Sequence, residues 1–369
     1  MTTNIPLVDL AAQHAQVADE VAAGWADILS RTAFVGGPAV AAFEAAYAEF
    51  VGTAHCVGVG NGTDAIELAL RALGTGPGDE CIVPANTFIA TAEAVARTGA
   101  TTVLVDCVDD TALIDPVAAG KAVTDRTKAV LPVHLYGQAA EVELLAEHLP
   151  DSVAIVEDAA QSQGALRHGK PAGSLGRIAA TSFYPGKNLG AYGDAGAVVT
   201  SDEELATAVR LLSAHGSPRK YEHSTLGFNS RLDAIQAVVL SAKLRRLAGW
   251  NAARRAAADR YAALLAGVDG VRLPVVAPGN EPVWHLYVVR VAERDRVLAA
   301  LNAAGIGAGI HYPTPVHLTG AFAGLGLGPG SFPVAEAMAG EILSLPLFAE
   351  ITPAQQERVV EVLAGAVQA

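Results

Sequence analysis

Lys187 lies just beyond an apolar stretch, 179–184, that is typical of a short β-strand. Pro185 and Gly186 separate the two, and both interrupt regular structure, since proline lacks an amide donor and glycine tolerates unusual backbone angles. The lysine is therefore predicted at a strand end, where open α/β sheets present their ligand-binding groups. An amine in a poorly solvated pocket has a lowered pKa and becomes a nucleophile that forms Schiff bases. A lysine in a surface turn has the same local pattern, so other segments of the chain must decide between a surface lysine and a nucleophile in a pocket.

Two acids follow a second apolar stretch, 153–156, and are good candidates for the chemistry of a cofactor. In the structural reading, one of Glu157 and Asp158 caps a helix and the other is a solvated charge. In the functional reading, Asp158 keeps the ring nitrogen of pyridoxal phosphate protonated, so that the ring accepts electrons from the substrate carbon. Gln161, three residues later, would then donate to or accept from the ring hydroxyl.

Gly60–Ala65 joins a predicted strand to a predicted helix and is a candidate phosphate site. Its glycines allow the backbone to approach a ligand, and the free amides of a helix N-terminus favour an anion. The segment is neither a Walker loop nor a complete dinucleotide fingerprint. An ordinary strand-to-helix turn capped by Thr63 fits it equally well. Ser182 is a second candidate donor to a phosphate, and Phe88, which is core by default, would stack on a cofactor ring.

Strand and helix patterns alternate through the first two thirds of the chain, which predicts a mostly parallel sheet covered by helices on both faces. Strands are expected at 55–60, 80–83, 102–106, 129–134, 153–157 and 195–200, with helices between several of them. A long helix is expected from Arg231, and the pattern changes past Trp250. We therefore expect a large domain, 1–245, and a smaller α+β domain, 246–369.

Composition restricts the class of protein. The net charge of −13, from 25 basic and 38 acidic residues, argues against nucleic acid or an anionic membrane as the main partner. The chain is 51% hydrophobic, but no signal peptide or membrane span is expected, since the uncharged segment 303–335 is interrupted by prolines and glycines. The three cysteines are not paired in sequence, which suits buried thiols in a reducing cytoplasm, and no metal site is expected.

These motifs, in this order, resemble the DegT/DnrJ/EryC1/StrS family of sugar-nucleotide aminotransferases, essentially from end to end. The segments that carry the resemblance are Gly-Asn-Gly-Thr-Asp-Ala at 60–65, Glu-Asp-Ala-Ala-Gln at 157–161, Ser-Phe-Tyr-Pro-Gly-Lys-Asn-Leu at 182–189, Gly-Phe-Asn-Ser-Arg-Leu-Asp at 227–233 and Gly-Ile-His-Tyr-Pro at 309–313. The resemblance implies pyridoxal 5'-phosphate as cofactor and the aspartate aminotransferase (type I) α/β fold.

The resemblance also implies a role for each matching residue. Lys187 would be the Schiff-base lysine and the proton carrier, and Asp158 the partner of the ring nitrogen. Asn229 would reach the phosphate in the neighbouring subunit's site, so that the enzyme is a homodimer with shared sites. The further cofactor contacts would be Gly62, Thr63, Phe88, Gln161 and Ser182. Candidate substrate contacts are Tyr184, Tyr221, His311 and Tyr312. For His311 and Tyr312, a structural turn in a long loop is the competing reading.

The implied reaction transfers an amino group, with glutamate as donor, to a keto group of a nucleotide-linked sugar. Family members that act at the 4-keto position commonly carry histidine where this chain has Tyr184, so the expected substrate is a dTDP-linked 3-keto-6-deoxyhexose. The alternatives are a dTDP-4-keto-6-deoxyhexose or a UDP-linked 3-keto sugar. A sugar dehydratase of the family would carry histidine at position 187. A non-catalytic regulator that binds the cofactor remains an alternative of another class. His134 is expected to be a packed, hydrogen-bonded histidine.

Overall fold

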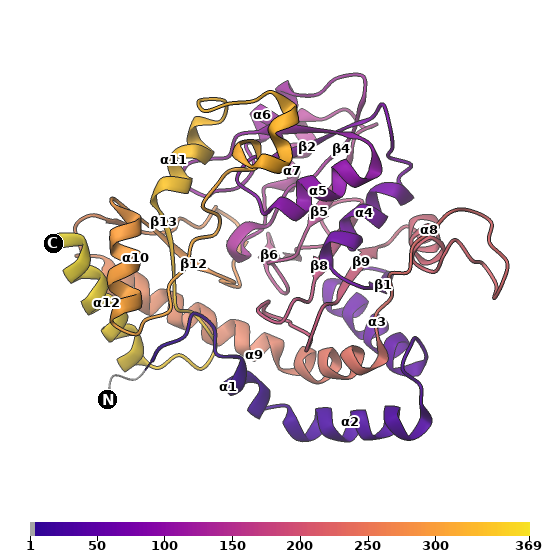
Figure 1. The fold of residues 1–369 in the computed structure, drawn as a ribbon, viewed down its shortest axis with the longest axis horizontal. Helices are drawn as coiled ribbons and strands as arrows, with labels where there is room; N and C mark the ends of the chain where they lie inside the picture. Colours follow the sequence, from indigo (N-terminus) through magenta and orange to yellow (C-terminus); the bar gives the residue numbers. More distant parts are fainter. Residues whose placement is uncertain (1–3) are drawn as a thin grey trace.

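The fold is centred on a seven-stranded sheet with strand order β1-β9-β8-β5-β4-β2-β3, in a computed structural model that describes residues 4–369 (Figure 1). Only β9 runs against its neighbours, so the sheet is mostly parallel, as predicted. Its strands are β1 His55–Val59, β2 Glu80–Pro84, β3 Thr101–Val105, β4 Thr127–Val130, β5 Ala154–Asp158, β8 Ile178–Ser182 and β9 Gly196–Thr200.

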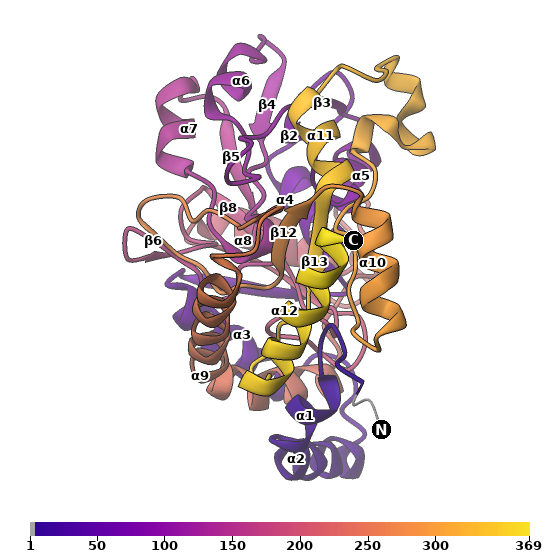
Figure 2. The same cartoon turned by 90° about the vertical axis from the view of Figure 1, so that its left-hand side faces the viewer.

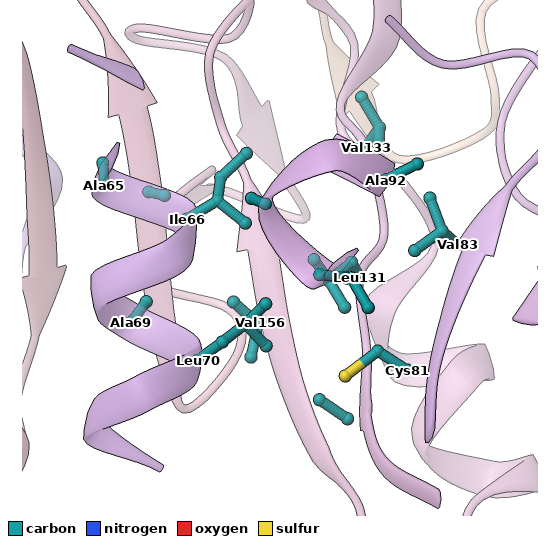
Figure 3. Close-up of a cluster of buried hydrophobic side chains, with 14 of the residues drawn as sticks. Ala65, Ile66, Ala69, Leu70, Cys81, Val83, Ala92, Leu131, Val133 and Val156 are labelled. Carbon is teal, nitrogen blue, oxygen red and sulfur yellow. The ribbon is translucent and has the colours of Figure 1, made fainter. Parts of the chain in front are cut away.

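Alternate residues of these strands pack on opposite faces of the sheet, because successive side chains of a strand point to opposite sides. Val198 belongs to the hydrophobic core beneath α4 and α5, whereas its neighbour Val199 packs against α3 and α9. Figure 3 shows the first of these cores, where Leu70 of α4 meets Val156 of β5. The central strands read as continuous apolar runs because both faces are covered.

Helices of the large domain cover this sheet on both sides. The helices of this domain are α1 Leu10–Ala15, α2 Ala18–Arg31, α3 Pro38–Val51, α4 Gly62–Ala72, α5 Ile89–Thr98, α6 Pro116–Lys121, α7 Val142–His148, α8 Glu203–Ser213 and the first half of α9 Ala234–Leu265. Among them, α2 packs against α9 and lies farther from the strands, next to α1 in the chain (Figure 1). A short 3-10 turn, Leu135–Gly137, follows β4, which ends at Val130 rather than at the expected residue 134. Pro132 lies in this difference and cannot donate a ladder hydrogen bond.

A second hydrophobic core forms at the C-terminal end of the chain. It joins β12 Tyr287–Val291 and β13 Ile342–Leu345 to α10 Arg294–Ala303 and α12 Pro353–Gln368. Figure 2 shows α10 and α12 next to each other, and Ile5 from the N-terminal segment is part of the same core. The remaining elements are β6 Leu166–Arg167, β7 Lys170–Pro171, β10 Val271–Arg272, β11 Asn280–Glu281, α11 Pro333–Glu341 and the 3-10 turns Val316–Leu318 and Gly320–Leu325.

The proposed domain division at 245/246 falls inside α9, which continues without a break for 32 residues. Residues such as Ala237 and Leu240, in its first half, pack on the large sheet, whereas Tyr261 and Leu265, in its second half, belong to the C-terminal core. One helix therefore joins two cores. The division at 245/246 stays a prediction. Because α9 belongs to both cores, any movement of one part relative to the other would have to bend or shift this helix.

Candidate active site

A cavity of about 650 Å³ opens at the carboxyl ends of β5 and β8, between the large sheet and loops of the C-terminal part. A cavity of only about 40 Å³ lies elsewhere, beside Arg272 and Arg290. All but two of the residues predicted as site residues line the large cavity: Gly62, Thr63, Phe88, Asp158, Gln161, Ser182, Tyr184, Lys187, His311 and Tyr312. Positions far apart in the sequence thus converge where an open α/β sheet binds its ligands.

Lys187 lies in the turn that follows β8, and its backbone N–H closes that turn by donating to Tyr184 O at 2.8 Å. Burial lowers the pKa of the Lys187 ammonium from 10.5 to about 8, although the nearby Asp158 carboxylate opposes the shift. Desolvation disfavours the charged form of an amine, and here it outweighs the attraction of the carboxylate. Lys187 lies in a turn, as expected, but it is half-buried and faces the cavity, and a usable fraction of its amine is neutral near physiological pH.

Replacing Lys187 by methionine should make the cofactor-free protein more stable near neutral pH, by about 2 kcal/mol. The unfolded lysine titrates near 10.5 and the folded one near 8, so the unfolded state binds more protons between these values. Stability of the wild type therefore rises with pH across this window, and the penalty is complete below about pH 8. Denaturant unfolding of both proteins at several pH values measures this. An equal difference at pH 7 and above pH 10.5 would contradict it.

Asp158, at the end of β5, is almost fully buried and is held as a hydrogen-bond acceptor. The hydroxyl of Thr91 donates to Asp158 Oδ2 at 2.7 Å, and the backbone N–H of Ala160 donates to Oδ1 at 3.1 Å. Donors on both oxygens fix the plane of the carboxylate. A carboxylate held in this way suits a cationic N–H group inside the cavity.

Glu157 and His134 form a buried structural pair beside the site. His134 Nδ1 accepts from Ala140 N at 2.9 Å, so the proton is on Nε2, which donates to Glu157 Oε2 at 2.7 Å. Three backbone N–H groups, those of residues 173, 175 and 176, also donate to the Glu157 carboxylate. The prediction of a packed His134 is confirmed. The reading in which one of Glu157 and Asp158 is a solvated charge is wrong, since both side chains are buried.

The N-terminus of α4 faces the cavity and forms one end of it. Asn61 caps this helix by accepting from Asp64 N at 2.8 Å, and Gly62 and Thr63 are in the first turn, where amides lack helical partners. A Cβ on Gly62 would lie 2.6 Å from Ser182 Cβ, so only glycine lets the helix approach this serine. Two free amides, a hydroxyl and the positive end of a helix fit a phosphate group.

Gln161 and the aromatic residues are placed by contacts across the cavity. Gln161 Oε1 accepts from Tyr136 N at 2.6 Å, and its Nε2 donates to Tyr312 OH at 3.1 Å. The rings of Phe88 and Tyr312 lie 5.0 Å apart. His311 Nδ1 is hydrogen-bonded to Ser344 Oγ at 2.8 Å. Both rings of the His311–Tyr312 pair therefore contribute to the cavity wall.

Tyr221 and Asn229 lie outside this cavity. Both are exposed residues of the segment between α8 and α9, which projects beside α8 (Figure 1). Tyr221 is 83% exposed. Their predicted roles require another subunit and stay predictions.

Sequence reasoning missed four polar residues at or behind the cavity: Thr91, Tyr136, Asn188 and His285. Thr91 had a local signal, since it is three residues after Phe88 and shares its face of a helix. Asn188 directly follows Lys187. His285 had no such signal, because only the tertiary fold brings the segment just before β12 to the cavity.

Comparison with known proteins identifies the family. Residues 16–364 match the model of the DegT/DnrJ/EryC1/StrS aminotransferase family. The chain belongs to this family. It is 48% identical over 362 residues to the dTDP-3-amino-3,4,6-trideoxy-alpha-D-glucose transaminase of Streptomyces venezuelae, covering 98% of this chain and 95% of that protein.

Two crystal structures of aminotransferase relatives confirm the predicted fold. DesV of S. venezuelae superposes with a TM-score of 0.97, at 46% identity and complete coverage of both chains. NtdA of Bacillus subtilis, with bound cofactor PMP, superposes with a TM-score of 0.89 at 31% identity, covering 96% of this chain and 82% of that one. This aminotransferase is an enzyme that transfers nitrogenous groups, and its cofactor is pyridoxal 5'-phosphate.

Proposed function

We propose that this aminotransferase converts a dTDP-linked 3-keto-6-deoxyhexose to its 3-amino sugar, with glutamate as amino donor, in the biosynthesis of a deoxyamino sugar. The observation that carries the proposal is the 48% identity, over almost the whole chain, to a relative named for a dTDP-3-amino sugar. Tyr184, which distinguishes this chain from members with histidine there, lines the cavity and is 59% exposed. It is open to contact with a substrate.

The cavity residues fit pyridoxal phosphate at three points. Gly62, Thr63 and Ser182 would hold its phosphate, and the carboxylate of Asp158 would hold its ring nitrogen. Gln161 would contact the ring hydroxyl, and Phe88 would stack on the ring. When bound, the cofactor supplies an electron sink that stabilises a carbanion at the substrate carbon.

Lys187 is proposed as the proton carrier of the reaction. A base works best when its pKa is close to the working pH, and burial brings the pKa of the Lys187 amine to about 8. Nζ would accept a proton from the substrate carbon and return it one position away in the 1,3-proton shift. Tyr184, His311 and Tyr312 would orient the sugar in the same cavity.

We also propose a homodimer in which Asn229 and Tyr221 of each subunit enter the partner's site. Neither residue lines the cavity of its own chain. Large apolar side chains are exposed nearby in the chain and on a second segment. Leu226, three residues before Asn229, is 93% exposed, and Phe34 and Val35, on the segment before α3, are 46% and 53% exposed. A second copy of the chain would cover such side chains. The three buried free thiols fit the proposed cytoplasmic location.

Mixed dimers test the sharing of sites. A dimer of one Lys187→Ala subunit and one Asn229→Ala subunit contains one doubly altered site and one intact site if the sites are shared. Such a dimer, isolated with two different affinity tags, should regain about half of the wild-type turnover per dimer, whereas each parent homodimer should have little. If each site is made by one subunit alone, both sites of the mixed dimer carry a substitution. A turnover no greater than the average of the two parent homodimers would therefore contradict the proposal.

The absorption spectrum of the holoenzyme tests the reaction itself. Glutamate should convert the visible band of the bound cofactor to the near-ultraviolet band of its amino form. A dTDP-3-keto-6-deoxyhexose should then restore the visible band faster than a 4-keto isomer or a UDP-linked 3-keto sugar. Restoration by another of these sugars would identify that alternative substrate. A cofactor band that glutamate never changes would favour the non-catalytic regulator.

A further inference from the structure

His285 is a cavity residue whose ring orientation is determined by its surroundings. Its side chain is 8% exposed and lines the same cavity as Lys187. The ring makes its protein hydrogen bond through Nδ1, at 3.3 Å from Asn188 Oδ1. In the part of the chain that the structure describes, Nε2 has no hydrogen-bonded partner, yet it is not among the polar atoms sealed from open space. Nε2 therefore reaches the cavity.

The tautomer of this ring follows from the amide of Asn188. Asn188 Nδ2 donates to Val283 O at 2.9 Å, and a backbone carbonyl can only accept. The same Nδ2 donates to Asn251 Oδ1 at 3.0 Å, and Asn251 Nδ2 in turn donates to Gln163 O at 2.9 Å. Asn188 Oδ1 is therefore the atom that faces His285, and it accepts. The His285 proton lies on Nδ1, and Nε2 presents a lone pair to the cavity.

The backbone around His285 is also held in place. Val283 N donates to Gly137 O at 2.8 Å, and a Cβ on Gly137 would lie 2.6 Å from His285 N. Trp284 has φ of 47°, a left-handed conformation that is unfavourable for a residue with a side chain, and its carbonyl accepts from Arg254 at 3.2 Å. Backbone strain next to a cavity residue persists only where the surroundings enforce it.

The charges around the ring keep it neutral. Burial, together with the positive charges of Lys187, Arg254 and His311, holds the pKa of His285 well below its usual range. The groups that face the His285–Lys187 pair come from several elements: Asp158 from β5, Arg254 from α9, and His311 and Tyr312 from the loop after α10. Of these, Asp158 favours the charged form of the lysine, whereas burial of the amine opposes it.

We propose that His285 is a positioning residue for Lys187: its Nε2 lone pair accepts a hydrogen bond from the lysine ammonium whenever that amine is not bonded to the cofactor. Asn188, the residue directly after Lys187, holds the imidazole in the tautomer that this requires. The inference rests on the proposed proton-carrying role of Lys187. A base that works while free of the cofactor must be kept in reach of the substrate carbon, and a neutral acceptor does this without charge repulsion.

Two measurements on the full chain without cofactor test this positioning role. In ¹⁵N-histidine-labelled protein, His285 should have a protonated Nδ1 and a pyridine-type Nε2 from about pH 6 to about pH 9. Competitive labelling of lysines at several pH values gives the pKa of Lys187. His285→Phe should lower that pKa by about one unit, because a hydrogen bond to the charged form is lost. His285→Gln, which retains an acceptor oxygen, should recover part of the shift.

The matched control is His148→Gln, at an exposed position on α7, which should leave the pKa of Lys187 unchanged. If His285→Phe leaves it unchanged too, or if Nε2 carries the proton, the positioning role is overturned. If the His285 ring contacts only the substrate, it will have the expected tautomer, but His285→Phe will not shift the pKa of Lys187. That result also overturns the proposal. Neither readout needs cofactor or sugar. A failure of the proposed reaction would be seen separately, in the absorption spectrum of the holoenzyme after glutamate is added.

Discussion

Lys187→Ala should lower turnover by about 10³-fold or more, because it removes both the attachment point of the cofactor and the proposed proton carrier. Each half-reaction needs a proton to leave one carbon and arrive at another, and no second lysine lines the cavity among residues 4–369. Steady-state kinetics with glutamate and the keto sugar measure the loss. The cofactor should still bind through the α4 N-terminus and Asp158, with a changed absorption band.

A matched change at Lys170, an exposed lysine of β7, should leave turnover unaffected. Added methylamine provides a sharper control, because a small amine that enters the cavity can replace the missing base. Partial rescue of Lys187→Ala by methylamine, with a rate that rises with pH, would support a proton-carrying role. Turnover of Lys187→Ala close to that of the wild type would exclude the proposed mechanism.

Asp158→Asn should have the second largest effect, a fall in turnover of about 10²-fold to 10³-fold together with weaker binding of the cofactor. Asparagine is similar in size, but it carries no charge and cannot keep a ring nitrogen protonated. The electron sink would then be much weaker, and one charge-assisted hydrogen bond would be lost. Single-turnover kinetics with glutamate separate the chemical step from cofactor binding, which equilibrium dialysis measures.

Thr91→Val is a milder test of the same carboxylate. It removes the hydroxyl that donates to Asp158 Oδ2 at 2.7 Å, and turnover should fall by about tenfold. Asp151→Asn, at an exposed position before β5, is the control and should have no effect. If Asp158→Asn retained full activity and full cofactor affinity, its role at the ring nitrogen would be refuted.

Local sequence predicted most of the site because each part of it is a short strand followed by a turn. Lys187 follows β8, Asp158 ends β5, and Gly62 opens α4 after β1. In a mostly parallel sheet the carboxyl ends of the strands meet at one edge, so residues at those positions must come together. The apolar strand patterns were strong because both faces of the sheet are buried.

Long-range packing decided what the sequence could not. Three features depend on contacts between distant segments: the burial of Glu157, the division of α9 between two cores, and the placement of His285 and Lys187 in one cavity. No local pattern encodes them. A break in hydrophobic pattern near residue 250 indicated a boundary, but the helix continued, because each half of α9 found a different apolar surface.

The sequence by itself therefore determined the family, the cofactor chemistry and the residues at the strand ends. The tertiary structure alone decided which protonation states these residues have. Burial and neighbouring charges, which arise only when the chain is folded, bring the pKa of Lys187 to about 8 and keep His285 neutral.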